Sequence, residues 1–474
     1  MLHRNLISDG NHPDRTGAKE ATVQRLTTLD AGFLEAEDSD RHISLAVGGL
    51  SILEGPMPQF DTIASGLAAR LTELPRFREV LHTHLLDLAP PEWVEVEDLD
   101  ITHHLHRAAL PRPGDDDALH RFVADVMERR LDRDRPLWEC WIVEGLADGR
   151  WAILLKIHHC IADGIATMHM FSSLADGGEG ETFATEIRAA KADPHQPVTS
   201  PKSVLNPLTW PGGLIRMAAT ATNAAALVVE GAAELVGGIV SPAAESSLNG
   251  PVTAMRRYSG ARVSLADVTK VTEAYGVTVN DVALAALTDS YRAALVRRGE
   301  KPTRTSLRTL VPVSVRANDA VGITDNRVSV MLPFLPVEKE DPVEQLLAVH
   351  RRLTKVKASG QREAGSIVMS AMNAVPFPLT AWFIRTATRL PQRGVVALAT
   401  NVPGPRKRMT ILGREVLHVL PIPPIALQLR TGVAILSYAD ELVFGVMADY
   451  DATPDVDEIA RGVTVAIAKL VERC

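Results

Sequence analysis

The segment from residue 151 to residue 171 constrains the fold more than any other part of the chain. Trp151–Ile157 is mostly apolar, which indicates a buried strand. The pair His158-His159 follows, and apolar residues then recur at helical spacing between Gly164 and Phe171. The sequence therefore predicts a strand, a turn and a helix. The two histidines lie at the junction, where a rigid scaffold can present side chains to a cleft.

These two histidines are candidate catalytic groups. Neutral imidazole has an ordinary pKa of about 6.5, so its free nitrogen can accept a proton at neutral pH. Asp163 follows His159 by four residues, and its carboxylate could orient the backbone, hold a cation or fix an imidazole. The alternative is a buried histidine pair followed by an Asp-Gly turn, without any chemistry. The residues alone leave both interpretations open.

A metal site is a further alternative. The candidate ligands form two groups, which are His158, His159 and Asp163 in one and His103, His104 and His106 in the other. Adjacent histidines on a strand point to opposite faces, which is unfavourable for chelation. The helical zinc spacing H-E-x-x-H does not occur in the sequence. We therefore expect no bound metal, and we expect the second group to be surface or interface residues.

Composition limits the possible partners. Hydrophobic residues make up 46% of the 474 positions and charged residues 23%, which is typical of a globular protein. The net charge of −8 argues against nucleic acid as the main partner, because binding phosphates requires a basic face. Three cysteines without metal-type spacing indicate a reducing cytoplasm. Cys160 lies between the histidines and Asp163, and a nucleophilic role for it is possible in principle.

The length predicts two domains of about 200 residues each, because one core rarely grows larger. Residues 1–24 are polar and lack the apolar region of a signal peptide, so we expect a flexible tail. We expect a first unit over residues 25–180, a linker with a connecting helix over 181–250, and a second unit over 251–474. In the linker, Leu214–Val240 is apolar but interrupted by charges.

This apolar stretch is too short to cross a membrane. Its longest uncharged run, Met217–Val229, has 13 residues, whereas a membrane span needs about 20. We expect a helix that packs between the two units or lies on a lipid surface.

The second unit shows a mixed α/β pattern. A helix is expected over residues 264–275, capped by Ser264, and Asn280 could cap another over 281–298 because its side-chain oxygen suits that position. Strand-like runs alternate with helices. The runs are residues 307–315, 328–335, 395–400, 431–438 and 442–450.

The string His-His-x-x-x-Asp-Gly, residues 158–164, resembles the active-site motif of the CoA-dependent acyltransferase superfamily. That superfamily includes chloramphenicol acetyltransferase, peptide condensation domains and wax ester synthases. Other strings resemble bacterial wax ester synthase/diacylglycerol acyltransferases, in the family's order and over roughly residues 24 to 460. These strings are Leu26–Leu34, Pro136–Glu139, Val279–Val282, Asn326–Ser329 and Thr400–Pro405. The pattern is nearest to the mycobacterial type of triacylglycerol synthase.

The resemblance implies an α/β fold of two chloramphenicol acetyltransferase-like domains around a central tunnel. It also implies that His159 is the general base, which takes a proton from an acceptor hydroxyl as the hydroxyl attacks an acyl-CoA thioester directly. His158 would shape the loop, and Asp163 would pair with an arginine that the sequence does not identify. A backbone N–H near Gly164 or the side chain of Asn280 could stabilise the oxyanion; Asn280 could equally serve as a helix cap only.

The implied substrates are long-chain acyl-CoA and diacylglycerol, with no bound cofactor because acyl-CoA is itself a substrate. Two alternatives remain, a wax ester synthase that uses a fatty alcohol and an inactive protein that coats lipid droplets. The intact histidine motif disfavours the inactive protein. We expect a cytoplasmic protein peripheral to membranes or lipid droplets. The basic run Arg406–Arg408 could meet phosphates or anionic lipid, or be a solvated charged surface.

Overall fold

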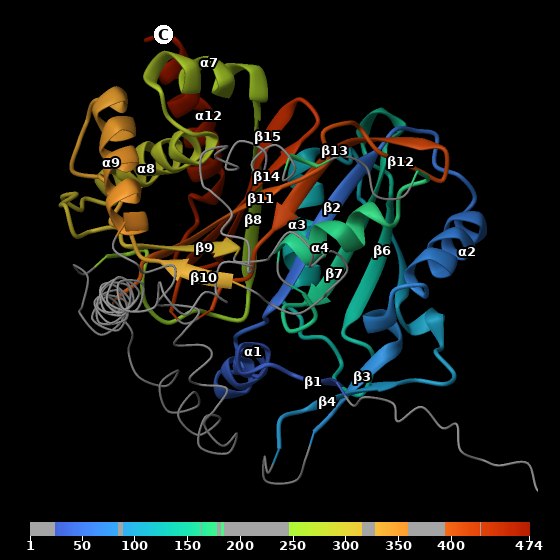
Figure 1. The fold of residues 1–474 in the computed structure, drawn as a ribbon. Coiled ribbons are helices and arrows are strands. Elements are labelled where there is room, and N and C mark those ends of the chain that lie inside the picture. The colour runs from blue at the N-terminus through green and yellow to red at the C-terminus, as the bar shows by residue number, and fades with distance from the viewer. Residues whose placement is uncertain are drawn as a thin grey trace, which may run out of the picture.

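The computed structural model of this chain is organised by two six-stranded sheets and one three-stranded sheet (Figure 1). It describes residues 24–83, 89–162, 164–177, 182–183, 246–314, 328–358, 394–426 and 428–474. The expected N-terminal tail up to residue 23, the apolar stretch Leu214–Val240, and Asp163 lie outside these residues. The fold is a two-domain mixed α/β fold, as the sequence predicted.

The first six-stranded sheet carries the two histidines at the end of a central strand. Its order is β12 (Thr410–Ile411), β13 (Arg414–Ile422), β2 (Ala46–Leu53), β7 (Trp151–His158), β6 (Trp138–Glu144) and β5 (Leu105–Ala109). Every residue of β7 is buried, and the strand runs antiparallel to both neighbours. Ala46, the first residue of β2, pairs with His158. His158 therefore lies where the central strands of the sheet end.

A single lysine within β7 connects the sheet to a helix. Lys156 is fully buried, and its Nζ donates to the Val126 carbonyl at 2.9 Å and the Arg129 carbonyl at 2.7 Å. These carbonyls lie at the C-terminal end of α3 (Asp116–Met127), where helical carbonyls lack partners and favour a positive charge. Burial lowers the pKa of Lys156. The lysine thus fixes the loop after α3 against the histidine-bearing strand.

The second six-stranded sheet has the order β10 (Val328–Met331), β9 (Thr309–Ser314), β11 (Ala397–Pro403), β14 (Thr431–Tyr438), β15 (Glu441–Asp449) and β8 (Arg256–Ser264). Four helices gather at its upper end in Figure 1, and they are α7 (Leu265–Tyr275), α8 (Val279–Arg297), α9 (Pro342–Ala358) and α12 (Val456–Val471). Apolar residues from the sheet and the helices form one continuous core. None of the helices within the described ranges is long and apolar enough to cross a membrane.

The C-terminal part of the chain contributes strands to both large sheets. β12 and β13 fall in the range predicted for the second unit, yet β13 pairs antiparallel with β2 and completes the first sheet. β14 then returns to the second sheet. The domain boundaries themselves stay a prediction, but the first sheet contains strands from both parts of the chain.

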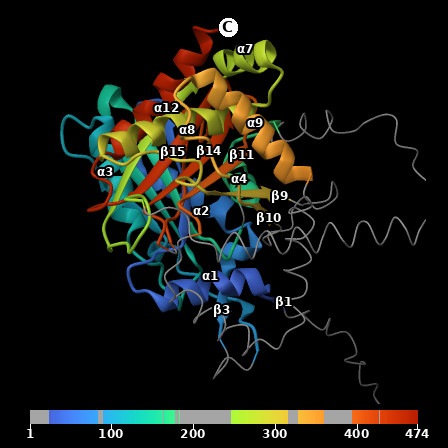
Figure 2. The same ribbon diagram turned by 90° about the vertical axis from the view of Figure 1, so that its left-hand side faces the viewer.

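The three-stranded sheet and the first helix lie together at one end of the molecule. The sheet has the order β1 (Gln24–Arg25), β4 (Glu92–Glu95) and β3 (Glu79–His82). α1 (Thr28–Ser39) begins after Thr27, whose hydroxyl accepts a hydrogen bond from the Asp30 amide at 3.2 Å. Figures 1 and 2 both place α1 and this sheet at the end opposite α7 and the C-terminus.

Of the two expected helix caps, Ser264 has the predicted N-cap position and Asn280 does not. Ser264 occupies the position before α7, but its side chain makes no capping hydrogen bond. Asn280 lies inside α8, which begins one residue earlier. Thr278 caps this helix instead, in a capping box in which the Thr278 hydroxyl accepts from the Asp281 amide and the Asp281 carboxylate accepts from the Thr278 amide.

Candidate active site

The strand, turn and helix predicted around the histidine pair are present. β7 ends at His158, and α4 (Gly164–Ser172) begins six residues later. Backbone hydrogen bonds within the turn and to the residue before β2 fix the turn between them. The Ile161 amide donates to the His158 carbonyl at 3.0 Å, and the His159 amide donates to the Leu45 carbonyl at 3.0 Å. Asp163 lies outside the described residues, so its pairing with an arginine stays a prediction.

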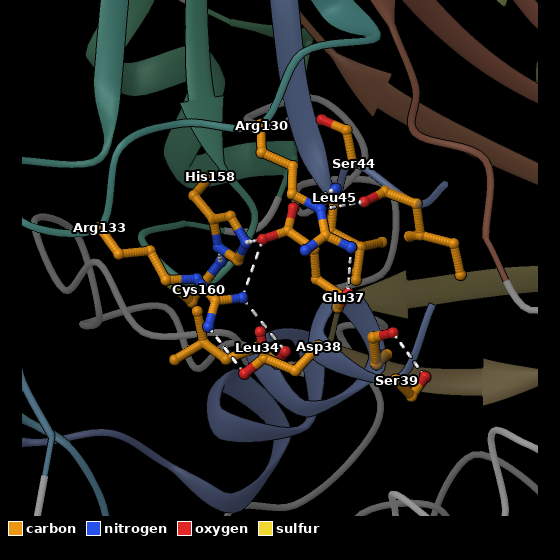
Figure 3. Close-up of polar contacts among 12 residues, drawn as sticks. Leu34, Glu37, Asp38, Ser39, Ser44, Leu45, Arg130, Arg133, His158 and Cys160 are labelled. Carbon is orange, nitrogen blue, oxygen red and sulfur yellow. Dashed lines mark hydrogen bonds and ion pairs between the residues drawn. The ribbon is translucent and has the colours of Figure 1, made fainter. Parts of the chain in front are cut away.

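The buried ring of His158 is held from two sides. Its Nδ1 accepts a hydrogen bond from the Cys160 amide at 3.2 Å, and its Nε2 lies 3.6 Å from the Glu37 Oε2 atom (Figure 3). The second distance is too long for a full hydrogen bond and corresponds to an electrostatic contact. Because a backbone amide can only donate, Nδ1 must be unprotonated in this arrangement. The neutral ring therefore carries its proton on Nε2, facing the carboxylate.

Glu37 is a buried carboxylate that remains ionised. Its side chain is only 1% exposed. Its Oε1 accepts from the Leu45 amide at 3.0 Å, and its Oε2 accepts from the Arg133 guanidinium at 2.9 Å. Burial by itself would raise the pKa of Glu37, but His158, the Leu45 amide and Arg133 together lower it to about 2. A full negative charge therefore faces His158 at neutral pH.

His159 differs from its neighbour because its ring is partly exposed. The ring of Phe33, from α1, stacks on it with the centroids 4.3 Å apart and the planes inclined by 28°. The stacking contact favours this orientation of the ring, and part of the ring remains exposed. A partly exposed and oriented imidazole can act as a general base.

Gly164 brings the first turn of α4 against the second sheet. A Cβ atom at this position would lie 2.8 Å from the Val402 Cγ2 atom of β11, closer than real Cβ atoms approach a neighbour. Only glycine therefore allows this contact without a shift of the helix or the strand. The turn that holds the histidines is in this way connected to both large sheets.

Asn280 reaches the same strand from α8. The side-chain amide of Asn401 donates to the Asn280 Oδ1 atom at 3.3 Å. Asn401 and Val402 are successive residues of β11 in regular register, so their side chains point to opposite faces. Gly164 and Asn280 thus meet β11 on opposite faces. The described contacts connect Asn280 to Asn401 and leave its role at the oxyanion a prediction.

Cys160 is unsuited to act as a nucleophile. It is fully enclosed between the turn and the first core, and burial raises the pKa of its thiol well above the ordinary range. The thiolate is the nucleophilic form. The side chain therefore stays a protonated thiol at neutral pH.

The second group of histidines is packed against tryptophans. His104 is only 3% exposed, stacks on Trp138 at 4.4 Å and donates from Nδ1 to the Trp138 carbonyl at 2.8 Å. His106 stacks on Trp141 at 4.4 Å. The expectation of surface residues is wrong for His104, because the aromatic residues of β6 cover it. Across the ranges that the structure describes, no group of three or more potential ligands is placed to hold a metal ion.

The basic run Arg406–Arg408 is partly paired. Arg408 lies 2.8 Å from Glu415 and 3.7 Å from Asp440, with 42% of its side chain exposed. The guanidinium of Arg406 lies over the ring of Phe183, 5.6 Å from its centroid. These contacts favour a solvated charged surface over a phosphate site.

Several site residues were not identified from the sequence. They are Glu37 beside His158, Arg133 beside Glu37, Phe33 beside His159, and Asn401 beside Asn280. Phe33 lies in one of the strings that resemble the acyltransferase family. Glu37 follows it by one helical turn but lies in an acidic stretch with Glu35, Asp38 and Asp40, so its sequence context did not single it out. No local spacing could reveal its pairing with His158, because the two residues are far apart in the chain.

Comparison with known proteins gives a consistent result. The family model of the wax ester synthase/diacylglycerol acyltransferase catalytic domain matches residues 26–283, and that of the WS/DGAT C-terminal domain matches residues 324–470. The Mycobacterium tuberculosis (strain H37Rv) protein named probable diacylglycerol O-acyltransferase tgs1 is 52% identical over 462 residues. This alignment covers 95% of this chain and 96% of the relative.

Solved structures show the same fold. The wax ester synthase/diacylglycerol acyltransferase from Marinobacter aquaeolei VT8 superposes with a TM-score of 0.67 at 24% identity, covering 95% of this chain and 99% of that one. The first condensation domain of the calcium-dependent antibiotic synthetase, in complex with a substrate analogue, superposes with a TM-score of 0.60 at 13% identity. It covers 95% of this chain and 97% of that one.

Proposed function

This chain belongs to the wax ester synthase/diacylglycerol acyltransferase family, and we propose that it transfers the acyl group of a long-chain acyl-CoA to diacylglycerol, forming triacylglycerol. The main structural support for an acyl-transfer reaction is the partly exposed ring of His159, which lies just after β7 and before α4. The choice of diacylglycerol is supported by the 52% identity to a relative that is named for this activity.

In the proposed reaction, His159 removes the proton from the acceptor hydroxyl as the hydroxyl oxygen attacks the thioester carbonyl. The carbon–oxygen bond forms, the carbon–sulfur bond breaks, and the imidazolium returns its proton to the departing CoA sulfur. A positioned base of this kind contributes about 10²–10⁴-fold to the rate. The thioester is already activated, so no nucleophile from the protein is required. The protonated thiol of Cys160 supports this direct route.

The negative charge on the carbonyl oxygen requires a hydrogen-bond donor. The first turn of a helix has N–H groups without helical partners, and its dipole favours a negative charge there. Gly164 begins α4 five residues after His159, so its backbone supports this role. Losing one such donor costs about 10²–10³-fold in kcat. We expect Asn280→Ala to cost less than tenfold, and a larger loss would assign the donor to Asn280.

One assay tests the substrate assignment. Purified protein is given labelled long-chain acyl-CoA with diacylglycerol and hexadecanol at matched interfacial concentrations, and the products are separated by class. We expect triacylglycerol to dominate, with some wax ester because one methylene in an apolar site discriminates by only about 1–3 kcal/mol. A preference for hexadecanol would instead identify a wax ester synthase. Folded protein that makes neither product would support the coating role.

We further propose that the protein is cytoplasmic and binds membranes or lipid droplets peripherally, since the proposed acceptor and product partition into lipid. High salt or mild detergent should release it from a membrane fraction. Resistance to both washes would contradict peripheral binding and point to insertion of Leu214–Val240.

A further inference from the structure

We propose that Glu37 is a positioning residue for acyl transfer, and that α1 holds both histidines of the site. In this arrangement Glu37 fixes the ring of His158, while Phe33 supports the ring of His159. We call the pair Phe33 and Glu37 the α1 clamp. The inference rests on the proposed function of His159 and adds a group that acts on it indirectly.

The two residues of the α1 clamp lie four positions apart in one helix, so they share a face and stand one turn above the other. The ring of Phe33 lies 4.3 Å from the ring of His159, and the carboxylate of Glu37 lies 3.6 Å from Nε2 of His158. Figure 3 shows α1 directly beneath the turn, with the Glu37 carboxylate pointing toward His158. One helical face therefore contacts both adjacent histidines.

Glu37 also controls the backbone of His159 through one intermediate residue. Its carboxylate accepts from the Leu45 amide at 3.0 Å, and the Leu45 carbonyl accepts from the His159 amide at 3.0 Å. In addition, the ring that Glu37 orients accepts from the Cys160 amide. Two consecutive amides of the turn thus depend on Glu37, one through Leu45 and the other through His158.

The helix is itself anchored by two arginines from the loop after α3. Arg133 donates to the Glu37 carboxylate at 2.9 Å and to the Asp38 carboxylate at 2.8 Å. Arg130 donates to the Glu37 and Asp40 carbonyls and, from Nε, to the Ile43 carbonyl at 2.9 Å. Asp38 already supplies Arg133 with a surface partner. The buried charge of Glu37 is therefore not needed merely to neutralise this arginine.

A double-mutant cycle separates positioning from packing. Glu37→Gln keeps the shape and the oxygen that faces the Leu45 amide, but it removes the charge that faces His158. His158→Asn keeps an acceptor for the Cys160 amide. We expect Glu37→Gln to lower kcat about tenfold while KM for acyl-CoA changes less than about twofold. In the His158→Asn background, Glu37→Gln should have little further effect on kcat, because coupled residues are non-additive.

Asp38→Asn is the matched control, since it also removes a charge from Arg133 but has no contact with His158. Its kcat should stay within twofold of wild type. Equal losses in Asp38→Asn and Glu37→Gln, or additive losses in the cycle, would overturn the proposal. If Glu37→Gln does not fold, Phe33→Leu provides the test. It should lower kcat about threefold or more at unchanged KM, and an unchanged kcat would overturn the α1 clamp.

A second readout is independent of activity. In protein labelled with ¹⁵N-histidine, the His158 signals are those lost in His158→Asn. The wild type should show the Nε2–H tautomer of His158, and Glu37→Gln should populate the Nδ1–H tautomer as well. If the wild type and Glu37→Gln show the expected tautomers but the wild type has no transferase activity, the proposed function is rejected. The contact of Glu37 with His158 is then still supported. An active wild type whose tautomer and kcat are unchanged by Glu37→Gln would reject the clamp alone.

Discussion

Two histidine-rich segments lie in the first sheet, and their surroundings separate them. His158 ends the central strand β7 and its ring faces an ionised carboxylate, while His159 begins the following turn and its ring is partly exposed. His104 immediately precedes β5 and His106 lies within it, and each stacks on a tryptophan of β6. In the sequence both segments looked like possible ligands. In the structure, only the first places a buried histidine ring beside a buried carboxylate.

The comparison shows that burial and charge act differently on the same side chain. Burial lowers the pKa values of His104 and His106, which keeps both rings neutral and apolar in character. Beside His158, by contrast, the buried group Glu37 stays charged because its pKa is lowered. Its carboxylate orients the ring of His158. We infer that the β5 segment contributes to stability and the β7 segment to chemistry. The predictions below test this division.

The largest effect is expected for the exposed ring of the β7 segment. His159→Ala should lower kcat by about 10² or more, because it removes the proposed general base. The melting temperature should change by only a few degrees, since the ring is partly exposed. Initial rates and calorimetry on the same preparation measure both quantities. Turnover near that of the wild type would move the base elsewhere and remove the distinction between the segments.

In the β5 segment, His104→Ala should affect stability instead. Removing a buried ring and its hydrogen bond to the Trp138 carbonyl should cost about 2–4 kcal/mol of unfolding free energy. The kcat of the remaining folded enzyme should stay within twofold. Urea titration and active-site-normalised rates provide the measurement. A lower kcat at unchanged stability would place this segment in the chemistry.

A smaller effect is expected from pH. The pKa values of His104 and His106 are lowered in the folded state, so the unfolded chain binds more protons below its own pKa of about 6.5. The folded protein should therefore lose stability as the pH falls below about 6.5. Urea unfolding at pH 7.5 and 5.5 should show this loss, and it should shrink in a variant in which both histidines are replaced by asparagine. An undiminished loss in that variant would assign the pH dependence to other groups.

The smallest effect is expected from metal removal. Since neither segment is predicted to bind a metal, activity after incubation with EDTA and gel filtration should equal that of untreated enzyme. Stoichiometric zinc in active protein, with loss of activity on its removal, would contradict the prediction that neither histidine segment binds a metal.

The parts of the fold that the sequence predicted are those with long apolar runs. The range 431–438 matches β14 at both ends, and β7 extends only one residue beyond its prediction. β8 and β13 were missed because charged residues interrupt their apolar pattern, as in Arg256-Arg257 and Arg414-Glu415. The cap of α8 could have been found, since Thr278 and Asp281 have the spacing of a capping box.

The site was predicted in part for a related reason. The junction at His158 and His159 is local, so strand and helix periodicity located it. The contacts of Glu37 with His158 and of Phe33 with His159 join distant segments. They depend on the packing of α1 against the end of β7, which no periodicity within either segment encodes.

The passage of β13 into the first sheet has a consequence for how the protein is made. During synthesis, β2 leaves the ribosome early, but its partner β13 emerges only after most of the chain. Until then β2 presents an unpaired edge, which is the kind of edge that favours association with other chains. Non-local pairing of this sort also slows folding. Expression of residues 1–250 alone should therefore yield an aggregation-prone fragment, and co-expression of residues 251–474 should rescue it by supplying the missing strand.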